Sequence, residues 1–192
     1  MADQTPPALA FLLSRRSCPA KTLGLPVPGR DSLLQLLTAA ARCPDHGKLE
    51  PWRFIVLENK ALARLGELAA ARGLSLGRDE AEITKGRQQF DDSHLAVAVI
   101  EVQKKSDKIP PIEQTYSAGA ACLSLLNAAL AAGWGANWLS GWPAHDRGFV
   151  ETGLGLESHE RVAGFIHIGT RGATPPERPR PDPEQISTWV TE

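Results

Sequence analysis

The segment Ser14-Arg15-Arg16-Ser17 places two guanidinium groups and two hydroxyls side by side, directly after the apolar run at 9–13. Adjacent helix positions point in different directions, so Arg15 and Arg16 do not form a helix-surface pair. Guanidinium groups form paired, charge-assisted hydrogen bonds with phosphates and carboxylates. The segment therefore indicates an anion site, and the alternative is a basic helix end that interacts with the helix dipole.

Two more segments carry polar and aromatic residues that folding alone does not explain. The first, ARCPDHGKLEPWRF, contains Arg42 and His46, and the second, GANWLSG, contains Trp138 and Ser140. Trp52 begins an expected strand, and we therefore interpret it as a structural residue. The candidates for function thus lie in three separate segments that the fold must bring together.

Several kinds of catalytic site are excluded. The sequence has no GxxxxGK[ST] phosphate loop and no GxSxG elbow, and GWGANW lacks the third glycine and the preceding strand of a dinucleotide fingerprint. A lone cysteine with remote histidines supports a thiol nucleophile only weakly. The five histidines lack HxxxH or HExxH spacing, which argues against a catalytic metal: His46, His94, His145, His159 and His167. We therefore expect a cofactor to supply the chemistry and assign no catalytic side chain.

Hydrophobic periodicity indicates the elements that position these segments. We expect helices over about 7–16, 32–42, 59–72, 78–89 and 144–153, and a long helix of about 22 residues within 111–135. Asp31 is the expected N-cap of the second helix, which ends before Pro44. Strands are expected at 52–58, 94–103 and 162–170, and the second is central because it is apolar on both faces.

The final segment, 172–192, contains five prolines: Pro175, Pro176, Pro179, Pro181 and Pro183. Proline at this density predicts an extended arm that does not form a helix. The arm ends in ISTWV, which favours a β conformation and could pair with the edge of a sheet.

Composition limits the class of protein. The 192 residues, 42% apolar and 22% charged with a net charge of -1, fit one globular domain and offer no basic face for nucleic acid. No apolar stretch is long enough to span a membrane. Cys18, Cys43 and Cys122 are too few and too far apart for a disulfide framework. We therefore expect a cytoplasmic protein without a membrane partner.

Taken together and in order, five segments resemble the FMN-dependent nitroreductase family and its small members most closely. They are Arg-Arg-Ser after the first helix, Arg-x-Pro-Asp-His before a Pro-Trp-x-Phe strand, the helix opening EQTYSAGAA, GANWLSG and the strand GFIHIGT. No single motif is specific, but the ordered set is, and it covers about residues 8–171.

The resemblance implies three groups of flavin-binding residues: Arg15, Arg16 and Ser17; Arg42 and His46; and Trp138, Leu139 and Ser140. The first group binds the FMN phosphate, with some members directed at the ribityl chain or the ring. The second approaches the flavin from the loop before the first strand. The third reaches the flavin across a dimer interface, although Leu139 stands where the family often has Arg.

Other departures leave alternatives open. Lys48 and Glu50 stand where larger members carry Asn and Gln. Lys48 either stabilises negative charge on reduced flavin or is an exposed surface lysine. The basic residue that often follows Arg-Arg-Ser is displaced to Lys21, and the sequence does not decide whether Arg171 contacts the flavin.

The implied protein is a single α+β domain with a central, mainly antiparallel sheet surrounded by helices. Its core spans about 8–171, and the arm 172–192 is exchanged in a homodimer with two FMN molecules at the interface. Hydride passes from NAD(P)H through the flavin to a nitroaromatic, a quinone or another small acceptor in a ping-pong reaction. The alternatives are a flavin-binding or flavin-delivery protein without turnover, and a module for another phosphorylated metabolite.

Overall fold

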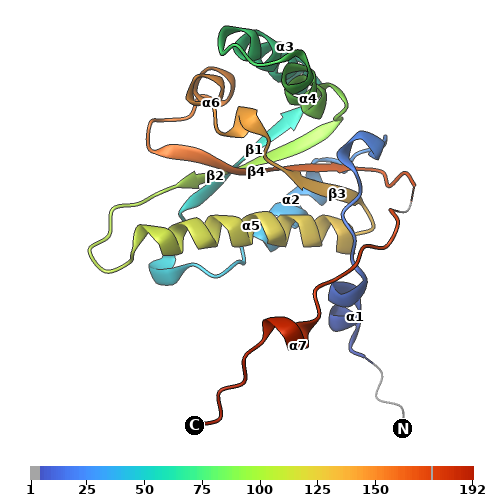
Figure 1. The fold of residues 1–192 in the computed structure, drawn as a ribbon, viewed down its shortest axis with the longest axis vertical. Coiled ribbons are helices and arrows are strands. Elements are labelled where there is room, and N and C mark those ends of the chain that lie inside the picture. Colours follow the sequence, from blue (N-terminus) through green and yellow to red (C-terminus); the bar gives the residue numbers. More distant parts are fainter. Residues whose placement is uncertain (1–4, 174) are drawn as a thin grey trace.

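A four-stranded antiparallel sheet with the order β1-β2-β4-β3 forms the centre of the fold, and helices cover both faces (Figure 1). The computed structural model describes residues 5–173 and 175–192. The strands are β1 (Trp52–Glu58), β2 (Leu95–Val102), β3 (Gly135–Leu139) and β4 (Glu160–Gly169). The α-helices are α1 (Pro7–Ser14), α2 (Arg30–Ala40), α3 (Asn59–Ser75), α4 (Glu80–Asp91), α5 (Pro111–Ala131), α6 (Arg147–Leu154) and α7 (Pro183–Ile186). Short 3-10 turns are η1 (Ala20–Thr22), η2 (His46–Lys48) and η3 (Trp142–Ala144).

Strand β2 lies at the centre, as its apolar sequence predicts, and all eight of its residues are buried. Val97 and Val99 pack in the core against α2 and α5, whereas Ala98 and Ile100 pack in the core beneath α3, α4 and α6. The alternation of side chains along a strand produces these two cores from one segment. Figure 1 shows α2 and α5 on one side of the sheet and α3, α4 and α6 on the other.

The predicted long helix is α5, which has 21 residues and crosses beneath β2, β3 and β4. Small buried residues such as Ser117, Ala118 and Ala121 allow its backbone to lie close to the sheet. Ser117 also accepts a hydrogen bond from the Trp52 indole at 3.1 Å, so Trp52 ties β1 to α5. This contact supports the structural role that we assigned to Trp52.

Several predicted helix ends differ from the structure by two or three residues: α3 ends at Ser75, α6 begins at Arg147, and the ends of α1 and α2 also differ. Helix α1 ends at Ser14 rather than near residue 16, and Arg15 has extended backbone angles. Arg15 and Arg16 therefore lie outside the helix, because the following segment docks against β3. Helix α2 begins at Arg30 with Gly29 as its N-cap, so Asp31 lies in the first turn instead. Its carboxylate still interacts favourably with the helix dipole there.

The arm leaves the sheet on the side of α5 and lies near α1 in Figure 1. The prediction that it forms no helix is wrong, because the single turn α7 begins at Pro183. Proline is tolerated at a first helical position, and the Asp182 carboxylate caps the turn by accepting the Glu184 N–H at 3.0 Å. Within residues 5–173 and 175–192, no helix combines the length and apolarity needed to cross a lipid bilayer.

Candidate functional site

The segment after α1 is fixed to the edge strand β3. The Cys18 N–H donates to the Ala136 carbonyl at 2.9 Å, and Asn137 Nδ2 donates to the Cys18 carbonyl at 2.7 Å. Further on, Gly24 and Thr170 exchange two backbone hydrogen bonds at 3.0 and 2.8 Å. Cys18 is only 1% exposed. These contacts hold Arg15, Arg16 and Ser17 beside the first residues of β3, although the sheet itself does not contain them.

Four arginines meet in a cavity of about 540 Å³ beside this segment, which we call the anion pocket. Arg15 and Arg16 come from the segment after α1, whereas Arg178 and Arg180 come from the arm. Arg15 Nη2 donates to Ser17 Oγ at 3.0 Å and thereby fixes one guanidinium. The remaining lining residues are Ser17, Pro19, Asn137, Pro175 and Pro176.

The charges in the anion pocket repel one another. Burial lowers the pKa of Arg15, and the charges of Arg180 and Arg16 lower it further. Arg15 Nε is buried without a hydrogen-bond partner among the described residues. Arg16 Nη1 lies 2.9 Å from Glu177 Oε1, and this ion pair is the one carboxylate contact of Arg16 among the described residues. Buried donors without partners are unfavourable, and a bound anion would satisfy them.

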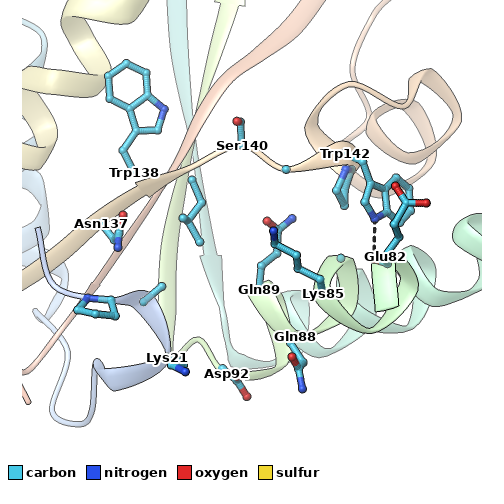
Figure 2. A pocket seen from close by; sticks show the side chains of 16 residues that line it. Lys21, Glu82, Lys85, Gln88, Gln89, Asp92, Asn137, Trp138, Ser140 and Trp142 are labelled. Atoms are coloured by element: carbon cyan, nitrogen blue, oxygen red, sulfur yellow. Dashed lines mark hydrogen bonds between the residues drawn. The ribbon is translucent and has the colours of Figure 1, made fainter. Parts of the chain in front are cut away.

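A second cavity of about 760 Å³, the α4 cavity, shares Pro19 and Asn137 with the anion pocket. The segment from Trp138 to Pro143 forms one wall, and one face of α4 forms the opposite wall. Figure 2 shows Lys85 and Gln89 directed toward the strand segment. Gln89 Nε2 is buried and has no partner among the described residues. Because the two cavities adjoin, one ligand with a negatively charged group at one end can occupy both.

Trp142 fixes the distance between the two walls of the α4 cavity. Its indole lies against Gly86, where a Cβ atom would meet ring atom Cε2 at 2.7 Å. Its Nε1 donates to the Glu82 carbonyl at 3.1 Å, and the Arg78 guanidinium lies 4.6 Å from the ring centroid. The absence of a side chain at Gly86 therefore allows η3 to pack directly on α4.

The structure brings two of the three predicted groups together within one chain. Arg15, Arg16 and Ser17 line the anion pocket, and Trp138, Leu139 and Ser140 line the adjoining α4 cavity. The Trp138 ring packs over Gly164 and points away from Lys85 and Gln89 in Figure 2. No partner chain is required to place these two groups side by side.

The third group lies elsewhere, and neither Arg42 nor His46 lines these two cavities. Arg42 is exposed in the turn after α2. His46 begins η2, and its Nδ1 lies 2.6 Å from the Glu113 carboxylate of α5. A flavin site that includes all three groups would therefore need Arg42 and His46 from another chain.

The loop after His46 has an unusual backbone. Lys48 and Glu50 have φ values of 55° and 49°, a region that residues other than glycine seldom adopt. The Asp45 carboxylate supports this shape by accepting the N–H groups of Leu49 and Glu50 at 3.1 and 2.8 Å. The side chains of Lys48 and Glu50 are exposed. Such strained backbone is frequent at binding sites.

Sequence reasoning noted Lys21 without assigning it to the site, and it missed several other lining residues: Lys85, Gln88, Gln89, Asn137, Arg178 and Arg180. The spacing of Lys85, Gln88 and Gln89 on one helix face is a signal, but it is also typical of a solvated surface. Arg178-Pro-Arg180 is a basic pair within the proline-rich arm. That pair was detectable, yet nothing in the sequence connects it with residue 15.

Comparisons with known proteins identify the family of this chain. The model of the Nitroreductase family matches residues 12–170. The chain belongs to the nitroreductase family. It is 32% identical over 163 residues to the Escherichia coli K12 protein named "Putative NAD(P)H nitroreductase YdjA", covering 85% of this chain and 87% of that protein.

Solved structures share the fold over nearly the whole chain. A nitroreductase-like family protein from Bacillus cereus superposes with a TM-score of 0.76 at 24% identity, covering 99% of this chain and 98% of the other. A "putative nitroreductase" from Desulfovibrio desulfuricans in complex with FMN superposes with a TM-score of 0.75 at 18% identity, covering 98% of this chain and 100% of the other. The predicted α+β, antiparallel architecture is therefore confirmed, whereas exchange of the arm is not tested by one chain.

Proposed function

We propose that this protein is an FMN-dependent oxidoreductase that takes hydride from NAD(P)H and reduces a small acceptor such as a nitroaromatic or a quinone. The observation that carries the proposal is the anion pocket, where four arginines converge beside the α4 cavity. The FMN in the Desulfovibrio desulfuricans relative and the name of the Escherichia coli relative support the choice of cofactor and electron donor.

The donors of the anion pocket fit a phosphate. The buried Arg15 Nε lacks a hydrogen-bond partner among the described residues, and Arg16 is paired only with the exposed Glu177 carboxylate. Guanidinium groups match the geometry of phosphate oxygens and stay charged. Arg15, Arg16, Arg178 and Arg180 would hold the phosphate together with the Ser17 hydroxyl.

The α4 cavity fits the isoalloxazine ring. Its walls combine apolar surface from Leu139 with donors and acceptors from Gln88 and Gln89, as a flat ring with carbonyl oxygens and an N–H requires. Lys85 adds positive charge that would stabilise electron density on a reduced ring. When bound, FMN accepts a hydride and passes the electrons on. The chain binds and orients the ring, and no side chain is assigned as an acid, base or nucleophile.

We also propose a homodimer, because apolar side chains lie exposed over α1, α5 and the arm. Large unpartnered apolar surfaces on a folded chain mark interaction sites. The exposed apolar residues are Leu9, Leu12 and Leu13 on α1; Ile112, Tyr116 and Leu123 on α5; and Ile186, Trp189 and Val190 in the arm. A two-fold contact through this surface would bring Arg42 and His46 of one chain toward the cavities of the other. The division of the site then differs from the predicted one, since Trp138, Leu139 and Ser140 would stay with Arg15.

The arm would complete the dimer. Within the described residues, β1 pairs only with β2, so the outer edge of β1 is available to another strand. Ile186 ends α7, and the exposed residues that follow, 187–190, carry backbone groups that such an edge can pair. We propose that the arm crosses to the partner there, which would cover an exposed edge.

The visible spectrum of the purified protein, reconstituted with FMN and treated anaerobically with NADH or NADPH, tests the function. We expect the absorption of bound flavin to bleach with at least one donor and to return when a nitroaromatic or a quinone is added. Bound flavin that neither donor bleaches would indicate a flavin carrier. Failure to bind FMN at all would indicate another phosphorylated ligand.

A further inference from the structure

Glu177 is the only carboxylate paired with arginines of the anion pocket among the described residues. Its Oε1 lies 2.9 Å from Arg16 Nη1 and 3.3 Å from Arg180 Nη2. The same oxygen accepts the backbone N–H of Arg178 at 3.0 Å. One carboxylate oxygen thus contacts an arginine from the segment after α1 and two residues of the arm.

The two side chains of the Glu177–Arg16 ion pair differ in exposure to solvent. The Arg16 side chain is 16% exposed, whereas the Glu177 side chain is 70% exposed. The guanidinium is thus fixed in the pocket wall, and the carboxylate can move into solvent without disturbing the core. The carboxylate neutralises the charge of Arg16 from the solvent side, where an incoming anion can replace it.

The Glu177 carboxylate lowers the net positive charge of the anion pocket. Four arginines alone repel one another, and the lowered pKa of Arg15 reflects that crowding after the effect of burial. One carboxylate removes one positive charge and leaves a surplus that a phosphate dianion can still neutralise. A ligand without charge gains nothing from the same surplus.

We propose that Glu177 is a stand-in anion that a phosphate must displace, and that it therefore sets the affinity of the anion pocket for phosphorylated ligands. This proposal rests on the proposed binding of the FMN phosphate. Displacement frees Glu177 and passes Arg16 and Arg180 to the phosphate. The arm is then held by the ligand instead of by its own carboxylate.

The test compares Glu177→Gln with Glu184→Gln, which removes the same charge from the arm outside the pocket. Equilibrium titrations with FMN and with riboflavin should show FMN binding about two- to five-fold tighter in Glu177→Gln, the range expected for one exposed ion pair. Riboflavin affinity should stay unchanged in both variants. The FMN affinity of Glu184→Gln should equal that of the unmodified protein.

Equal FMN gains in both variants would show a long-range charge effect and would overturn the proposal. Weaker or unchanged FMN binding in Glu177→Gln would overturn it as well. Thermal shifts with inorganic pyrophosphate separate this result from failure of the proposed function. If the unmodified protein does not bind FMN, a larger pyrophosphate-induced shift in Glu177→Gln than in Glu184→Gln would still support displacement, and equal shifts would reject it.

Discussion

The capacity of the anion pocket to bind an anion depends on individual guanidinium groups, because their N–H donors form few hydrogen bonds within the chain. Arg161 offers a contrast, since its guanidinium donates to both oxygens of the buried Glu101 carboxylate and to Thr115. Arg15 has one such partner, Ser17 Oγ, and its Nε has none among the described residues. Arg161 therefore stabilises the fold, whereas Arg15 is available to a ligand.

Replacing both Arg15 and Arg16 with Ala should weaken FMN binding far more than riboflavin binding. Each lost charge-assisted hydrogen bond costs about 1.5 to 3 kcal/mol, so each arginine should contribute about tenfold or more to FMN affinity. Fluorescence titration of the two flavins measures the ratio. Arg30→Ala, which replaces an exposed arginine outside both cavities, is the control. Equal losses for FMN and riboflavin would reject a phosphate contact.

His167 should make the protein sensitive to acid. Its ring is 1% exposed, Nδ1 lies 2.9 Å from Ser93 Oγ, and burial lowers its pKa to about 4. Between the ordinary value of 6.5 and about pH 4, the unfolded chain takes up a proton that the folded chain excludes. Stability should therefore fall across that window on acidification, by on the order of 3 kcal/mol.

Denaturant unfolding at several pH values checks this prediction. In His167→Gln the loss of stability between pH 6.5 and 4 should be smaller than in the unmodified protein. His145→Gln, which removes an exposed imidazole, should retain the original slope. Identical slopes in all three proteins would contradict a role for His167.

At the residue scale, sequence reasoning identified side chains whose neighbours already suggest their chemistry. Arg15, Arg16 and Ser17 are contiguous, so their shared ligand chemistry is visible in the sequence. Arg178 and Arg180 also form a local pair, but proximity to Arg15 depends on the path of the arm in space. No periodicity encodes that path.

At the level of elements, α4 and η3 pack against each other at Gly86 and Trp142, and both line the α4 cavity. Alanine usually stabilises a helix interior by about 0.5 to 1 kcal/mol relative to glycine. Gly86→Ala should instead destabilise the protein by about 1 to 3 kcal/mol, because its Cβ would displace the Trp142 ring. The melting temperature and FMN affinity should both fall.

Thr84→Ala provides the matched control on the same helix, since Thr84 is exposed. It should raise stability slightly through helix propensity and leave FMN affinity unchanged. Equal melting temperatures for Gly86→Ala and the unmodified protein would show that η3 can move away from α4 without cost.

Elements with strong periodicity were predictable, and their ends were not. The apolar run of β2 and the Ala- and Leu-rich α5 bury long continuous faces, so their positions follow from composition. Strand β3 was left unassigned because GANWL is short and mixes glycine, asparagine and tryptophan. Its strand conformation comes from pairing with β4, which is a long-range contact. The ends of α1 and α2 likewise depend on docking and on a glycine cap.

For the whole molecule, the exposed end of the arm predicts dependence on a second copy. Ile186, Trp189 and Val190 are 70%, 87% and 82% exposed. Truncation after Pro183 removes them but keeps Arg178 and Arg180. The truncated protein should show a higher dimer dissociation constant and a lower melting temperature, with FMN loss following separation of the subunits.

Sedimentation over a range of concentrations measures this change, and the full chain should sediment as a dimer of 20.7 kDa subunits. A truncated protein that stays dimeric with an unchanged melting temperature would show that the arm end does not contribute. A monomeric full chain that binds FMN fully would reject the shared site.

The anion pocket also has a consequence for synthesis of the chain, because it joins residues far apart in sequence. Arg15 and Arg180 are separated by 165 positions (180 − 15) and line the same cavity. At elongation rates of about 5 to 20 residues per second, Arg180 is added roughly ten to thirty seconds after Arg15. During that interval a nascent chain can form much of its sheet but lacks half of its arginine cluster. Full affinity for a phosphorylated cofactor should therefore appear only after the arm has left the ribosome.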